Sequence, residues 1–158
     1  MNIKQGNLNE FKPINYINNK YIISWGLKEI GNDTYEWKYF IIDKKPSVGY
    51  IKNTITGYVN EMTKKLIENG FYWNKMNIKL TLENQIDYKL LFDTTMLLDG
   101  SNLPEKIKFK VNGENIYYEI ESIEEFKDFI IKMNNHIRNC VKTGYDIKES
   151  INYDEYKI

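Results

Sequence analysis

The sequence of 158 residues has one cysteine, one histidine and no excess of charge of either sign. A single cysteine excludes a disulfide framework, and one cysteine with one histidine excludes a zinc site built from these residue types. Lys plus Arg and Asp plus Glu both number 22, so the basic excess that general nucleic-acid binding requires is absent. No apolar run reaches the length of a membrane span and no secretory signal opens the chain, so we expect neither a membrane protein nor a signal-dependent secreted one.

Alanine is absent altogether, and arginine occurs once, at Arg138. No folding rule favours a chain without alanine, which is the best helix former. Isoleucine, lysine, asparagine and tyrosine are abundant instead, and all four use AT-rich codons. The bias therefore indicates an AT-rich genome, such as that of a bacterium or a phage, and carries no information about mechanism.

The sequence lacks the motifs of the common catalytic sites: G-x-S-x-G, G-x-x-x-x-G-K-[ST] and G-x-G-x-x-G. His136 and Cys140 stand four residues apart on a predicted helix, but Cys140 falls on its apolar side, which favours a buried thiol. Asp87, Asp93 and Asp99 are interpreted as solvated carboxylates. We expect no catalytic residue, no cofactor site and no metal site, and hence no enzyme.

The first twenty residues are rich in asparagine and show no hydrophobic period, which is typical of a flexible arm. Such an arm packs on its own domain or on a neighbouring subunit, and the second placement is favoured here. Phe11, Ile14 and Tyr16 are its candidate contact residues.

Alternating apolar residues predict a β-hairpin over residues 21–43. A three-residue Gly-Asn-Asp loop would place Trp25 opposite Tyr39 and Leu27 opposite Trp37, which gives one continuous aromatic face. The face is either part of a core or, together with Trp73, a platform on which a sugar could stack.

A helix is predicted over residues 48–69, capped by Ser47 and ended by Asn-Gly. Its apolar residues follow near-heptad spacing, at Val48, Ile51, Ile55, Tyr58, Met62 and Leu66. This seam packs on its own domain or mediates self-association, and for the second case Ile51, Ile55 and Tyr58 are candidate interface residues.

The next segment predicts a short hairpin that turns at Asn74-Lys75, followed by a helix over about residues 82–98 with Thr81 as its cap. The side chains expected to face inward from this helix are Leu82, Ile86, Leu90 and Leu97.

A third hairpin is predicted by apolar residues that alternate with charged ones. Pairing residues whose numbers sum to 227 sets Ile107 opposite Ile120 on the apolar face and Lys108 opposite Glu119 on the other. A capping box of Ser122 and Glu125 then opens a helix over residues 123–142, ended by Gly144, and a last short helix is expected in the tail.

The sum is an α+β protein in which antiparallel hairpins alternate with about three helices. We expect an extended N-terminal arm over residues 1–20 and a single α+β domain over residues 21–158.

The order of motifs from about residue 21 to residue 150 resembles a phage-encoded domain of unknown function. Three stretches carry the resemblance: W25-G-L-K-E-I-G-N-D-T-Y-E-W37, N69-G-F-Y-W-N-K-M-N-I-K-L-T-L-E-N-Q-I-D-Y-K89, and the segment from F126 to I137-R-N-C-V-K-T-G-Y-D-I-K148. Such domains recur in tail-fibre, baseplate and other peripheral virion proteins, including those of crAss-like phages of gut Bacteroidetes.

The resemblance implies a structural or adapter role in a virion, as a small component of a fibre, spike, collar or baseplate. The partners would be other virion proteins in a homo-oligomer or symmetric assembly, with no nucleic acid and no membrane, and the protein would be made in the host cytoplasm. The alternatives are a receptor- or glycan-binding module that uses Trp25, Trp37 and Trp73, and a cytoplasmic phage protein directed at a host factor.

Overall fold

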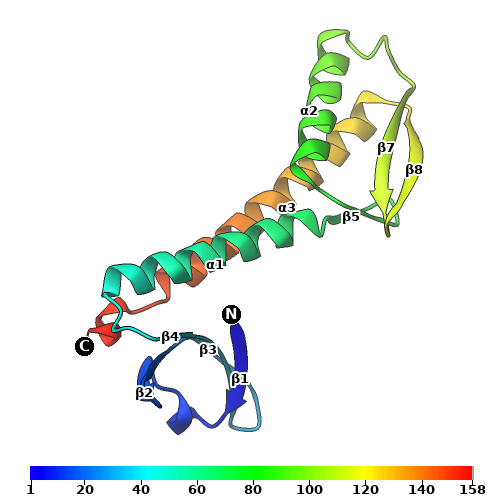
Figure 1. Ribbon diagram of the computed structural model, residues 1–158. Helices are drawn as coiled ribbons and strands as arrows, with labels where there is room; N and C mark the ends of the chain where they lie inside the picture. Colours follow the sequence, from blue (N-terminus) through cyan, green and yellow to red (C-terminus); the bar gives the residue numbers. More distant parts are fainter. Residues whose placement is uncertain (158) are drawn as a thin grey trace. The chain divides into compact units, whose positions relative to one another are not determined.

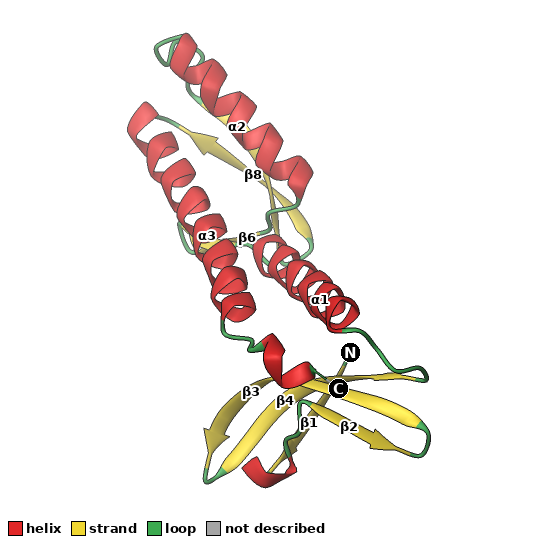
Figure 2. Ribbon diagram, turned by 90° about the vertical axis from the view of Figure 1, so that its left-hand side faces the viewer, coloured by secondary structure: helices red, strands yellow, loops and turns green. Residues whose placement is uncertain are grey.

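The computed structural model describes residues 1–157 and divides them into two compact units (Figure 1). One comprises residues 1–61 and 144–157, and the other comprises residues 62–143. Each unit contains one four-stranded antiparallel sheet, and three α-helices complete the chain (Figure 2). The predicted α+β class is therefore confirmed.

The first sheet has the strand order β1-β4-β3-β2, and all its neighbours are antiparallel. Its strands are β1 (Asn2–Gly6), β2 (Ile14–Ile17), β3 (Lys20–Gly31) and β4 (Thr34–Ile42), with a short 3-10 helix, η1 (Leu8–Glu10), between β1 and β2. The first twenty residues thus pair with their own sheet: β1 with β4, and β2 with β3. The placement on a neighbouring subunit was the wrong choice, because this arm supplies both edge strands of its own sheet.

The predicted register of the β3–β4 hairpin holds at Lys28–Glu36 and Glu29–Tyr35 but is wrong at Trp25. Trp25 lies opposite Lys38, and Ser24 lies opposite Tyr39. The loop is the two-residue turn Asn32-Asp33, but a register shift between Glu29 and Gly31 offsets it. The error comes from a second shift, between Trp25 and Lys28, where Gly26 adopts a positive φ.

The shift separates two tryptophans that were predicted to share a face. Alternation along the paired strands places Trp25 and Trp37 on opposite faces of the sheet. The ring of Trp25 meets Tyr58 edge-on at 5.6 Å between centroids, whereas Trp37 meets Phe11 at 5.9 Å. The continuous aromatic face is therefore absent.

Helix α1 spans Val48–Glu68, close to its predicted bounds, and the Ser47 hydroxyl accepts the backbone N–H of Tyr50 as its cap. In the first unit, its residues Ile51 and Ile55 are fully buried. The C-terminal 3-10 helix, η2 (Tyr153–Tyr156), is the short helix expected in the tail, and the Tyr156 hydroxyl donates to the Ser24 carbonyl at 2.7 Å.

The second sheet has the order β5-β6-β7-β8, again antiparallel throughout. Its strands are β5 (Phe71–Trp73), β6 (Met76–Ile78), β7 (Glu105–Val111) and β8 (Glu114–Ile120). The turn at Asn74-Lys75 is confirmed, since both residues adopt the positive φ of a type I′ turn.

The register predicted for β7 and β8 is wrong by two residues. Ile107 lies opposite Tyr118, and Val111 lies opposite Glu114. The cause is the tight Asn112-Gly113 turn, with both residues at positive φ, which leaves only two residues in the loop. A slip of two keeps every side chain on its predicted face, so the apolar and charged faces are as expected.

Helix α2 spans Leu82–Leu97, and α3 spans Ile123–Glu149. The caps at Thr81 and Ser122 are confirmed: each hydroxyl accepts the N–H three residues on, at 3.2 and 3.1 Å. The reciprocal half of the capping box differs, because the Glu125 carboxylate accepts the N–H of Glu121. Gly144 does not end α3, which continues for five more residues without a break.

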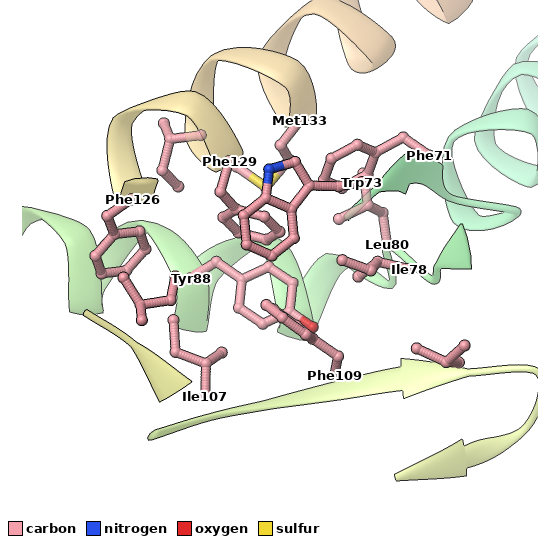
Figure 3. Packing of buried hydrophobic residues seen from close by; sticks show 13 residues of the cluster. Phe71, Trp73, Ile78, Leu80, Tyr88, Ile107, Phe109, Phe126, Phe129 and Met133 are labelled. Atoms are coloured by element: carbon pink, nitrogen blue, oxygen red, sulfur yellow. The ribbon is translucent and has the colours of Figure 1, made fainter. Parts of the chain in front are cut away.

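The core of the second unit is dominated by aromatic rings from the sheet and both helices (Figure 3). Phe129 lies at its centre, with ring centroids of Trp73, Tyr88 and Phe109 between 5.1 and 5.3 Å away. Offset and edge-on pairs at such distances add to the free energy of burial. This core holds α2 firmly by one side and determines which of its faces points to solvent.

Candidate functional site

Helix α2 carries a row of large aliphatic side chains on its exposed side. Leu82 is 67% exposed, Ile86 51%, Leu90 60% and Leu97 84%. These are the side chains expected to face inward, so that prediction is wrong. Single exposed apolar residues are ordinary, but four on one helix face, the first three at intervals of four residues, mark a candidate contact site. We call these four residues the α2 outer row.

The opposite face of α2 packs on the core through residues whose polar ends are satisfied. Tyr88 is buried, and its hydroxyl donates to the Lys108 carbonyl at 3.3 Å. The side-chain amides of Asn84 and Gln85 donate to the carbonyls of Lys79 and Leu80 at 3.2 and 2.9 Å. Because the buried side mixes the polar Asn84 and Gln85 with Tyr88, the spacing of the aliphatic residues pointed to the wrong face.

Burial and a neighbouring charge both change the pKa of the Tyr88 phenol. Loss of solvent, and secondarily the negative charge of Asp87, raise the pKa of Tyr88 to about 12. The hydroxyl therefore stays a hydrogen-bond donor further into the alkaline range than an ordinary tyrosine, and its bond to the Lys108 carbonyl anchors the inner face of α2 to β7.

The α2 outer row is about 22 Å long, since fifteen residues separate its ends at 1.5 Å each. Acidic side chains at Glu83 and Asp87 lie on the same helix, and Lys89 forms an exposed ion pair with Asp93 at 2.9 Å. An apolar row with charged residues beside it is the usual pattern of a helix that packs on another helix.

The interface residues proposed from the arm and the seam lie in varied surroundings. Ile51 and Ile55 are fully buried inside the chain, which leaves them no surface for a partner. Phe11 packs edge-on against Trp37, and Tyr58 packs against Trp25.

The two remaining arm residues lie on β2, an edge strand. Ile14 is half-buried opposite Ile23, whereas Tyr16 is exposed and its ring contacts that of Tyr21 in a tilted arrangement, at 4.6 Å between ring centroids. Of the six proposed interface residues, Tyr16 is the one the structure leaves well exposed.

The three tryptophans proposed for sugar stacking are buried. Trp25 is 1% exposed, Trp37 2% and Trp73 4%. The Trp73 indole N–H also donates to the Asp128 carboxylate at 2.9 Å. None of the three offers a ring face to a ligand, so the stacking assignment is corrected to a core role.

The one pair with nucleophilic chemistry is close but not activated. The Cys140 sulfur lies 3.6 Å from His136 Nε2, which is also 3.4 Å from the Ile67 carbonyl oxygen. Burial raises the pKa of the Cys140 thiol, which disfavours the reactive thiolate. Cys140 is buried, as predicted.

Within residues 1–157, no three His, Cys, Asp or Glu side chains come together as metal ligands would. In the same part of the chain, no helix is long and apolar enough to cross a membrane.

The α2 outer row could have been found from the sequence by plotting both sides of the helix. Leu82, Ile86 and Leu90 recur at intervals of four, while Tyr88, Leu91 and Phe92 lie on the opposite side. A helix that is apolar on two sides can bury one side in its own core and present the other to a partner.

No protein-family model matches the chain, and neither the curated proteins nor the solved structures yield a match.

Proposed function

We propose that this protein is a structural component of a bacteriophage particle, a small part of a fibre, spike, collar or baseplate, that acts through protein–protein contacts. The order of sequence motifs supports the setting. The α2 outer row supports the mode of action and is the observation that carries the proposal: four large aliphatic side chains on one helix face, each at least half exposed.

We infer that the α2 outer row packs against the α2 helix of a second copy of the protein. Antiparallel pairing brings Leu82 of each copy to Leu97 of the other and leaves Ile86 and Leu90 of both near the centre. Two-fold contacts of this kind are the commonest in homo-oligomers. The row then supplies the apolar seam, with the ion-paired Asp93 between Leu90 and Leu97 and other charged residues of α2 beside it.

The alternatives find less support. A glycan-binding module would need solvent-facing aromatic platforms, and the three tryptophans assigned to it are buried. No feature of the described residues favours a cytoplasmic protein directed at a host factor. Such a protein would be absent from particles, so mass spectrometry of purified particles distinguishes it from a virion component.

Quantitative mass spectrometry of gradient-purified phage particles, produced from the genome that encodes this protein, tests whether the protein is a virion component. We expect peptides of this protein at a fixed ratio to the portal protein, with a copy number that follows the symmetry of one particle part. Absence from clean particles would remove the virion role and favour the host-directed alternative.

Sedimentation equilibrium of the purified protein tests the contact. We expect concentration-dependent self-association that is lost in the double variant Leu82→Glu/Leu90→Glu, because two carboxylates would be buried in the seam. The matched control is Lys127→Glu/Lys142→Glu, two exposed α3 positions outside the row. Equal self-association of both variants would rule out the α2 outer row as the contact surface.

A further inference from the structure

A groove of about 460 Å³ lies between the first half of α2 and strand β7, entirely within the second unit. Its walls include Glu83, Asp87 and Tyr88 from α2 and Lys106, Lys108 and Lys110 from β7. The groove is separate from the α2 outer row, whose four residues do not line it.

Strand β7 has one covered edge and one largely free edge. On one side, β8 pairs with it along its whole length, from Glu105–Ile120 to Val111–Glu114. On the other side, β6 pairs with it at Ile78 and Val111 alone. Residues 105–109 therefore have no strand beside them on the groove side.

Two hydrogen bonds identify which backbone groups point to this free edge. The Lys110 carbonyl accepts the N–H of Lys79 at 3.0 Å, and the Lys108 carbonyl accepts the Tyr88 hydroxyl. In an antiparallel ladder, alternate residues direct their N–H and C=O groups to opposite edges. The N–H groups of Lys106 and Lys108 therefore point toward the groove, with no strand to receive them.

The side chains along this edge form a row of positive charge. Lys106, Lys108 and Lys110 are exposed on the same face of β7, and in residues 1–157 none of them takes part in an ion pair. On the facing wall, Glu83 and Asp87 add negative charge. A strand placed between the walls would meet lysines with one face and carboxylates with the other.

We propose that this groove binds an extended peptide segment of a partner protein by β-strand addition to the free edge of β7. The recognised segment carries acidic residues at alternate positions, beside the lysine row, and polar or basic residues between them, facing Glu83 and Asp87. Main-chain hydrogen bonds to Lys106 and Lys108 provide affinity, and the alternating charges set register and specificity. The Lys108 carbonyl has two lone pairs, so it can accept from an added strand while Tyr88 remains bound.

A peptide fits this edge better than a nucleic acid does. Phosphates would neutralise the lysines, but they would be repelled by Glu83 and Asp87 and would not match the alternating donors and acceptors of a strand edge. The inference does not rest on the α2 outer row, and each proposal can fail alone.

The test titrates the intact protein with the fluorescein-labelled peptide Glu-Thr-Glu-Lys-Glu-Thr-Glu and follows fluorescence anisotropy. The matched control peptide is Glu-Glu-Thr-Lys-Thr-Glu-Glu, which has the same composition but divides its glutamates equally between the two faces of a strand. We expect saturable binding of the first peptide and at least about tenfold weaker binding of the second. Equal affinity of the two would overturn the proposal, as would stronger competition by an unlabelled oligothymidylate of seven nucleotides.

Protein variants locate the site. Lys108→Glu should weaken binding at least about tenfold, whereas Lys142→Glu, an exposed lysine of α3, should change it less than about twofold. Equal effects of the two would show general charge attraction and overturn the proposal.

Peptide N-methylation tests the main-chain bonds without any change to the protein. Alternate N–H groups of an added strand point toward and away from β7, so methylation of residues 3 and 5 and methylation of residues 2, 4 and 6 block opposite edges. We expect one set to abolish binding and the other to retain it, with slowed hydrogen exchange at the amides of Lys106 and Lys108. Equal losses, or unchanged exchange at those amides, would overturn strand addition.

Discussion

Helices α2 and α3 both carry apolar side chains at helical spacing, but the second unit covers them differently. Within this unit, the apolar face of α3 is buried, with Phe126, Phe129 and Met133 in the core. Helix α2 uses Tyr88 and its neighbours for the core and leaves an aliphatic row outside. A helix with one apolar face can be oriented from its sequence, whereas a helix with two needs the rest of the fold to decide between them.

The largest effect that would test this comparison is expected at Phe129 of α3. Its ring is fully buried among Trp73, Tyr88 and Phe109. Phe129→Ala should lower the free energy of unfolding by about 3–5 kcal/mol, because it removes those contacts and leaves a cavity. Urea unfolding followed by tryptophan fluorescence measures it.

The matched control for Phe129 is Ile131→Ala, an exposed position on the same helix, for which a change within about 0.5 kcal/mol is expected. If both substitutions lower the free energy of unfolding by the same amount, the side of α3 that faces the core has been assigned incorrectly.

A smaller effect is expected at Tyr88, which anchors the inner face of α2. Tyr88→Phe removes the hydrogen bond to the Lys108 carbonyl, and we expect a loss of about 0.5–1.5 kcal/mol at neutral pH. The variant also has a pH signature. The pKa of Tyr88 is about 12 in the folded protein, against an ordinary value of 10.0, so the unfolded chain releases this proton first. The contribution of Tyr88 to the free energy of unfolding is therefore fully present below pH 10 and is lost as the pH rises toward 12.

Thermal unfolding between pH 9 and pH 12 measures that alkaline decline. Tyr88→Phe should make it shallower without removing it, because burial also raises the pKa of Tyr156. An unchanged alkaline slope would show that the phenol of Tyr88 is solvated in the folded state.

Local chemistry accounts for what the sequence predicts correctly. The bounds of α1, the caps at Thr81 and Ser122 and the turn at Asn74-Lys75 each depend on a few adjacent residues, and all four agree with the structure. These features are encoded locally, so they can be predicted without knowing the tertiary fold.

The errors have different origins. In the β7–β8 hairpin, the Asn112-Gly113 turn was a local signal that was interpreted as a longer loop. In the β3–β4 hairpin, the pairing of Trp25 was changed by the register shift between Trp25 and Lys28. The pairing of β1 with β4 has no local signal, because residues 2–6 become a strand only beside partners that are 29 to 37 residues away, from Gly6–Tyr35 to Asn2–Tyr39.

The smallest expected effect separates the two sides of α2 at adjacent leucines. Leu90 lies in the outer row, whereas Leu91 packs against the core. At concentrations where the protein is monomeric, Leu90→Ala should change the free energy of unfolding by less than about 0.5 kcal/mol. Leu91→Ala, with the same loss of atoms, should cost about 2 kcal/mol or more, because its contacts are internal. Only Leu90→Ala should weaken self-association in sedimentation. If Leu90→Ala destabilised the monomer as much as Leu91→Ala, the outer row would be part of the core and could not serve as a contact surface.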